Sequence, residues 1–219
     1  IPNRLYGIMT NATLVAVPLF IFMGVILEKS KVAELLLNSM SKLFSKYKSG
    51  LGISILFVGA LLAASTGIVG ATVIAMGLIS LPAMLQRGYS EKISTGLIAA
   101  TGTLGQIIPP SIALVILGDV LATAYQQSQL KIGNYVAKSL SVGDLFMAAI
   151  VPGLILVIIY GLYFIFNLRK EDIISTNDSR EESFIKLIST LAPPFFLIFA
   201  VLGSIIFGVA SPTEAAGIG

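Results

Sequence analysis

Two short polar stretches interrupt apolar sequence, and their residue types are those that bind ions inside a membrane. The first, STGIVGAT, spans residues 65–72, and the second, GTLGQIIPPS, spans residues 102–111. Proline has no backbone N–H and disrupts the helical turn before it, so the second stretch leaves carbonyl oxygens without helical partners. Freed carbonyls at interrupted membrane helices coordinate sodium. The two stretches together therefore predict a sodium site.

The candidate site residues form two sets, according to the group that each would offer. Oxygen ligands for sodium are expected from Ser65, Thr66, Gly67, Gly102, Gly105, Ile108 and Pro110. Helix N-termini at such breaks present unpaired N–H groups, which favour the carboxylate of an anionic substrate. The substrate-binding candidates are the polar side chains near the breaks, namely Thr72, Thr103, Gln106 and Ser111. No catalytic residue and no metal other than sodium is expected.

Each of these features also has a structural interpretation. A cluster of Gly, Ser and Thr in a membrane helix is a common device for close packing. The IIPPS segment fits a hinge or a static kink, and Gln106 fits a hydrogen bond between helices as well as a substrate contact. Asp119, at the end of the second apolar window, is interpreted as a solvated boundary residue. Since neither window contains Asp or Glu, a proton relay of intramembrane carboxylates is disfavoured.

Composition sets the class of protein in which these stretches occur. The chain is 56% hydrophobic and 11% charged, with a mean hydropathy of +0.94, whereas an ordinary soluble domain is roughly a quarter charged. It contains no Cys and no His, which excludes disulfides, thiolate metal sites and histidine acid–base chemistry. Its net charge of +3 is dispersed, unlike the basic face of a nucleic-acid binder. We therefore expect a multi-pass membrane protein that is not an enzyme.

The apolar windows predict the membrane elements. They cover residues 12–27, 51–64, 71–85, 93–118, 145–166 and 184–210. The region 51–85 is too long for one span and too short for two, because arms of roughly 14 residues rise about 20 Å in a core of about 30 Å. It is predicted to form a re-entrant helical hairpin, followed by a broken helix at 93–118. A single long tilted helix, with Gly67 and Gly70 as packing positions, is the alternative for 51–85.

The segment that follows the first window changes from apolar to amphipathic. Its apolar residues recur at helical spacing, and lysines follow near its end: Val32, Leu35, Leu36, Met40 and Leu43, then Lys42, Lys46 and Lys48. This pattern is typical of a helix that lies in the membrane interface, although a connecting helix outside the membrane fits it too. The loops 28–50, 86–92 and 169–186 are richer or denser in Lys and Arg than 119–143, so the feet of the hairpin are expected on the cytoplasmic side. The charged run 169–182 is interpreted as a solvated loop.

The order and spacing of the motifs resemble the large membrane subunit of tripartite ATP-independent periplasmic (TRAP) transporters, the DctM-like family. The similarity covers nearly the whole chain, and its most specific parts are the hairpin tip, GTLGQIIPPS and the terminal PTEAA. The first residues show no signal peptide, and SPTEAAGIG looks like the start of another apolar element. We therefore expect an N-terminal-half fragment of a longer permease.

The resemblance implies an all-α polytopic fold, with transmembrane helices, a re-entrant hairpin and a broken helix forming one half of an inverted-repeat, elevator-type transporter. Residues 1–49 would hold a scaffold span and the interfacial arm helix, residues 50–125 part of the moving transport domain, and residues 126–219 a periplasmic loop, scaffold spans and the start of the second repeat. Family members import organic anions, typically carboxylates, across the bacterial inner membrane with sodium as the coupling ion and no other cofactor. Their partners are a small membrane subunit, a periplasmic substrate-binding protein and the lipid bilayer.

Two other functions remain open at this point. A divalent-anion/sodium symporter shares the hairpin design and needs no binding protein. A structural or channel-like membrane subunit would use the breaks only for packing.

Within the resemblance, Ser65 and its neighbours match the family's first hairpin tip, and Gly105, Ile108 and Pro110 match the break that carries the carbonyls.

Overall fold

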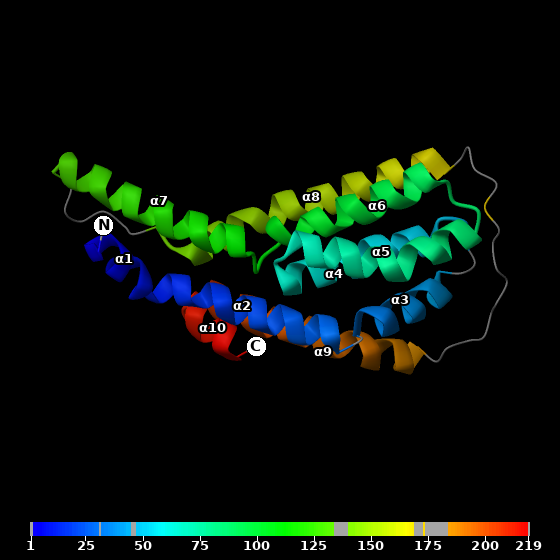
Figure 1. Cartoon of the computed structure of the whole chain (residues 1–219), viewed down its shortest axis with the longest axis horizontal. Coiled ribbons are helices and arrows are strands. Elements are labelled where there is room, and N and C mark those ends of the chain that lie inside the picture. The colour runs from blue at the N-terminus through cyan, green and yellow to red at the C-terminus, as the bar shows by residue number, and fades with distance from the viewer. Residues whose placement is uncertain are drawn as a thin grey trace.

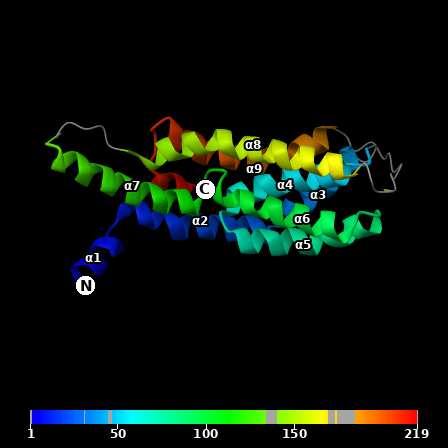
Figure 2. The same cartoon turned by 90° about the horizontal axis from the view of Figure 1, so that it is seen from above.

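The structure, a computed structural model, describes residues 2–30, 32–44, 47–133, 140–168, 173 and 184–218. All regular elements in these ranges are helices (Figure 1). They are α1 (Pro2–Met9), α2 (Ala12–Lys29), α3 (Val32–Leu43), α4 (Gly50–Thr66), α5 (Val69–Gln86), α6 (Glu91–Thr103), the 3-10 turn η1 (Leu104–Gln106), α7 (Ile112–Lys131), α8 (Val142–Leu168), α9 (Phe184–Ile206) and α10 (Pro212–Ile218). Most of them run along the long axis of the molecule, as expected for helices that cross a bilayer together (Figures 1 and 2).

The helices α4 and α5 form a hairpin whose two feet lie at the same end of the molecule (Figures 1 and 2). The chain reverses at Gly67, which caps α4 in the left-handed conformation with φ of 60°. Glycine adopts this conformation without the Cβ clash that other residues incur. The alternative of one continuous helix over 51–85 is therefore wrong, and the break falls inside the predicted tip at residues 65–72.

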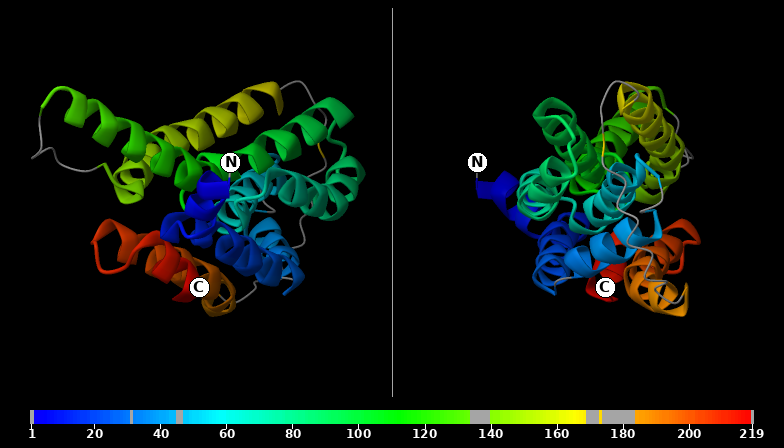
Figure 3. Two further views of the ribbon diagram at one scale, coloured as in Figure 1. Left: turned by 60° about the vertical axis from the view of Figure 1, so that its left-hand side comes forward. Right: turned by 90° about the vertical axis from the view of Figure 1, so that its right-hand side faces the viewer.

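The helix α4 is the centre of the bundle. It is apolar on all sides, and it contacts α2, α3, α5, α6, α8 and α9. Its side chains dominate the larger hydrophobic core, to which α3, α5, α6 and α8 also contribute. A helix that is hydrophobic all round has to be covered by neighbours or lipid, and here the view along the long axis shows other helices gathered around it (Figure 3, right).

A second, smaller core lies at the other end of the molecule. It joins α2, α7, the start of α8, the end of α9 and α10 around three large buried side chains, namely Phe20, Phe146 and Val201. The larger core reaches the breaks, since it includes Ala63 and Leu104. Figure 1 shows the hairpin turn and the interruption between α6 and α7 between the two ends of the molecule. The breaks therefore lie near the middle of the long axis.

Two described helices are long and apolar enough to cross a membrane, α5 and α8. On α8 a broad apolar surface remains uncovered, with Val151, Leu154, Ile158 and Leu162 at least half exposed. Water does not favour such a surface, since removing apolar area from water contributes about 25 cal/mol per Å². The exposed face of α8 is thus suited to lipid or to another apolar protein surface.

Two elements differ from the sequence-based predictions, and the amphipathic helix forms where it was predicted. The polar stretch after residue 118 is not a loop from its start, because α7 continues to Lys131; its Ala, Leu and Gln residues have good helix propensity, and the Thr123 hydroxyl donates to the Asp119 carbonyl. The first apolar element is preceded by a separate helix, α1. The amphipathic helix α3 buries Leu36 and Met40 against the bundle. The charged run 169–182 lies outside the described residues, apart from Ile173.

Candidate functional site

The hairpin tip is held by backbone hydrogen bonding and by close contact with α7. The Gly67 N–H donates to the Ala63 carbonyl at 3.0 Å, which closes the last turn of α4. A Cβ atom added to Gly67 would lie 3.3 Å from Cγ1 of Ile112, in the first turn of α7. The tip is thus packed against the point where the broken helix resumes. The side chains of Ser65 and Thr66 lie outside the described part of the structure.

The broken helix separates α6 from α7 by η1 and an irregular segment. A continuous helix would bond the carbonyls of Gly105 and Gln106 to the N–H groups of residues 109 and 110. Both of these residues are proline and have no N–H to donate. The Gln106 carbonyl instead accepts a hydrogen bond from the Ser111 hydroxyl at 2.9 Å. The doubled proline thus removes the helical partners of two successive carbonyls.

The tip and the break meet through Gln106. Its side-chain nitrogen Nε2 donates a hydrogen bond to the Gly67 carbonyl. Immediately before it, the backbone of Gly105 passes against the end of α4, where an added Cβ would lie 2.6 Å from the Ala63 carbonyl oxygen. Residues 39 positions apart are therefore joined directly, and only a glycine fits at the closest approach.

The remaining sodium candidates line the flanks of this contact. Gly102 is buried, and an added Cβ would lie 2.2 Å from Cγ2 of Val73 on α5. Pro110 is buried and follows Pro109 through a cis peptide bond. Ile108 is half-buried and faces Gly153 of α8, where an added Cβ would lie 3.0 Å from Ile108 Cγ1. These residues place the break between the hairpin and α8.

The hydroxyls among the substrate candidates bond locally to the backbone. Thr72 is buried and donates to the Ile68 carbonyl at 3.0 Å. Thr103 is exposed and donates to the Ala100 carbonyl at 2.7 Å. Ser111 is buried and caps α7, accepting from the Leu114 N–H at 3.3 Å. Among the hydrogen bonds described for these four side chains, that of Gln106 connects the hairpin to the break.

Asp119 belongs to a polar contact that sequence reasoning missed. The Asn11 side-chain nitrogen donates to both carboxylate oxygens of Asp119, each at 3.0 Å. This bond joins the start of α2 to α7, beside a cavity of about 380 Å³ that Thr13, Ser141 and Ser211 also line. Asp119 is half-buried, and the Asn11 donor stabilises its carboxylate, so this residue also holds two helices together. An Asn directly before an apolar run was the available signal, since Asn11 also caps α2.

Comparison with known proteins places this geometry in a family. Residues 1–219 match the family model described as "Tripartite ATP-independent periplasmic transporter, DctM component". The chain belongs to this family. Membership confirms the resemblance and identifies the molecule as part of a membrane-embedded transporter subunit rather than an enzyme.

The relatives of this chain have names that give different substrates. The C4-dicarboxylate TRAP transporter large permease protein of Rhodobacter capsulatus is 34% identical over 94% of this chain and 46% of its own length. The ectoine TRAP transporter large permease protein of Halomonas elongata is 32% identical over 94% of this chain and 44% of its own length. The sialic acid TRAP transporter large permease protein of Vibrio cholerae is 28% identical over 99% of this chain and 47% of its own length. The chain thus spans less than half the length of these relatives.

Proposed function

We propose that the chain is part of the permease subunit of a sodium-coupled secondary transporter that imports organic anions delivered by a periplasmic binding protein. The observation that supports this most is the contact between the hairpin tip and the break, at Gln106 and Gly67. It brings together two interrupted elements near the middle of the long axis, which is where transporters of this design bind substrate and coupling ion.

The chemistry of the contact favours sodium as the coupling ion. The groups available are backbone carbonyls, including that of Gly105, whose helical partner is removed by Pro109. Neutral oxygens of this kind suit an alkali cation, because such an ion is coordinated electrostatically by the dipoles of several oxygen ligands. Bound sodium would join the tip to the break, so its loss would loosen the site.

An anionic substrate suits the same region. The buried N-terminus of α7, capped by Ser111, begins directly after the break, and a helix N-terminus carries a partial positive charge of about +0.5. The C4-dicarboxylates, ectoine and sialic acid of the named relatives all carry a carboxylate group. We infer that the substrate of this permease is also an organic acid and that its carboxylate lies near α7.

The cellular setting follows from the same proposal. The permease would span the bacterial inner membrane, with the hairpin feet on the cytoplasmic side. A small membrane subunit would support it, and the binding protein would dock at the periplasmic end, where α1 and the end of α7 lie. The part of the permease beyond this chain would supply the second half of the site.

Uptake by the complete permease distinguishes this function from its alternatives. The permease, its small subunit and the binding protein are reconstituted in liposomes, and entry of radiolabelled C4-dicarboxylate, ectoine and sialic acid is measured under a sodium or a potassium gradient. We expect uptake of one of these acids only with sodium and the binding protein together. Sodium-driven uptake without the binding protein would indicate the divalent-anion symporter. Uptake that depends on neither the sodium gradient nor the binding protein would contradict sodium-coupled transport.

A binding measurement tests the ion site without any substrate. A ligand that binds only the folded protein stabilises it by about 2.7 kcal/mol at a concentration 100 times its dissociation constant. Sodium chloride should therefore raise the unfolding temperature of the permease in detergent, while potassium chloride at equal ionic strength should not. Equal effects of the two salts would count against a sodium site.

A further inference from the structure

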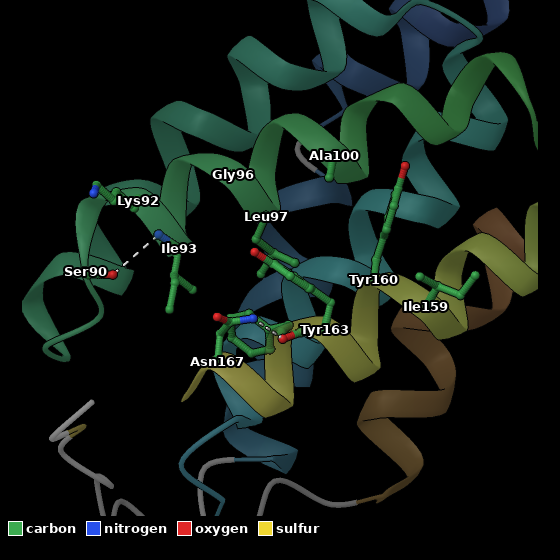
Figure 4. A pocket seen from close by; sticks show the side chains of 11 residues that line it. Ser90, Lys92, Ile93, Gly96, Leu97, Ala100, Ile159, Tyr160, Tyr163 and Asn167 are labelled. Carbon is green, nitrogen blue, oxygen red and sulfur yellow. Dashed lines mark hydrogen bonds between the residues drawn. The ribbon is translucent and has the colours of Figure 1, made fainter. Parts of the chain in front are cut away.

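A second site lies outside the tip and break, in a cleft of about 700 Å³ between α6 and α8 (Figure 4). The α6 wall contains the small residues Gly96 and Ala100, and no heavy atom lies within 4 Å of a Cβ added to Gly96. The hollow exists because these positions carry almost no side chain. The α8 wall opposite is made of larger residues, including Ile159 and Tyr160.

The cleft is amphipathic along its length. Figure 4 shows Ser90 and Lys92 at one end, with Asn167 across from Ile93, and Ile159 and Tyr160 toward the other end. Lys92 is the only cation among the described lining residues, and none of those residues is a carboxylate. One charged end and an otherwise apolar groove match the chemistry of an anionic lipid.

The cation at this end is available to a ligand. Arg87, in the turn before α6, donates to the Ser41 hydroxyl at 3.1 Å and is therefore engaged with α3. Lys92 lines the cleft and is exposed. A lysine near an anionic membrane surface contributes about 1 kcal/mol of attraction, and its apolar stem can cover apolar surface while its ammonium group remains in the polar layer.

The inner wall of the cleft is well fixed. Phe164 is 3% exposed and stacks on Tyr89, with ring centroids 6.0 Å apart. The Tyr89 hydroxyl in turn donates to the Lys48 carbonyl at 2.5 Å. The groove therefore does not close by movement of these rings, and something has to fill it in the membrane.

The surroundings of the cleft decide what fills it. Its α8 wall continues into the uncovered apolar face of that helix, where Ile158, Leu162 and Phe166 are at least half exposed. In a bilayer this face borders acyl chains, so a chain enters the cleft from the side without leaving the hydrocarbon. We propose that the α6/α8 cleft binds an anionic phospholipid, with an acyl chain between the helices and the phosphate at Lys92.

Photolabelling in a defined membrane tests this assignment without relying on sodium coupling. The complete permease is reconstituted in phosphatidylcholine vesicles that contain either phosphatidylglycerol or phosphatidylcholine with a photoreactive acyl chain, and labelled peptides are mapped by mass spectrometry. We expect stronger labelling of the α6 and α8 lining by phosphatidylglycerol. Lys92→Gln should lower that preference about fivefold, the factor for one lysine at an anionic surface. Lys131→Gln, at the far end of α7, is the matched control and should change nothing.

A second variant tests the groove itself. Gly96→Phe places a ring in the hollow and should reduce labelling of the lining by both lipids to background, whereas Gly77→Phe on α5, also at a glycine with open space, should not. Equal labelling of the lining by both lipids would overturn the proposal that the cleft selects an anionic headgroup. A lining that neither lipid labels would mean that protein covers the cleft. Loss of lipid labelling when a free organic anion is added would mean that a water-soluble acid occupies the cleft. Either result overturns the proposal.

Discussion

At Gly105 the broken helix makes its closest approach to the hairpin. A Cβ there would lie 2.6 Å from the Ala63 carbonyl oxygen, which is backbone and has no flexible end to move aside. We expect Gly105→Ala to destabilise the permease by about 1–3 kcal/mol, the usual cost of overpacking, and to abolish sodium-coupled uptake with membrane insertion intact. Thermal unfolding in detergent and the uptake assay measure the two effects. Gly77→Ala is the control, because its Cβ would meet no atom within 4 Å. Normal sodium dependence in Gly105→Ala would refute the ion-site assignment.

Gln106 stabilises the same contact by a hydrogen bond, whereas Gly105 does so by close steric fit. Gln106→Leu keeps the volume but leaves the buried Gly67 carbonyl without its donor, which costs about 1–3 kcal/mol. If Gln106 positions that carbonyl for sodium, the variant should raise the sodium concentration needed for half-maximal uptake more than it lowers the maximal rate. Gln126→Leu, an exposed glutamine of α7, should alter neither. A lower maximal rate with an unchanged sodium requirement would assign Gln106 to packing alone.

At the scale of elements, the doubled proline determines whether α6 and α7 are one helix or two. Pro109→Ala with Pro110→Ala restores two N–H groups, which can bond the carbonyls of Gly105 and Gln106 as in a continuous helix. We expect the double variant to protect the amides of residues 109 and 110 in hydrogen exchange and to lose sodium-dependent uptake. Pro152→Ala, in the interior of α8, removes a proline outside the site and should retain uptake. Full sodium coupling in the double variant would show that the freed carbonyls are not needed.

The sequence predicted the elements better than it predicted their contacts. The windows 12–27 and 145–166 lie within α2 and α8, and the expected tip contains the actual turn at Gly67. These features depend on local apolar length and on Gly and Pro, which are visible in one sequence. The bonds of Gln106 with Gly67 and of Asn11 with Asp119 depend on which helices become neighbours, over separations of 39 and 108 residues. The length of α7 was missed because the second half of this helix is polar and has no apolar periodicity.

At the scale of the whole molecule, the proposed division into a moving part, 50–125, and a static scaffold has a direct consequence. The break packs on α8 at Gly153, where an added Cβ would lie 3.7 Å from Ile108 Cα. The two Cα atoms are therefore well inside the limit of about 7 Å for a disulfide. Because the chain has no cysteine, Ile108→Cys with Gly153→Cys can be introduced without competing thiols. Oxidation should arrest uptake if the break has to move past α8, and reduction should restore it.

The control for this cross-link lies entirely within the proposed moving part. A Cβ on Gly59 of α4 would lie 3.3 Å from Thr101 Cβ on α6, so Gly59→Cys with Thr101→Cys joins two helices that should travel together. Oxidation of this pair should leave uptake as it is in the reduced protein, since no relative motion is blocked. The two pairs thus separate rigid-body movement from general damage by a disulfide. Undiminished uptake with Ile108 and Gly153 fully cross-linked would mean that the break and α8 move as one body, and the boundary between transport part and scaffold would then lie elsewhere in the chain.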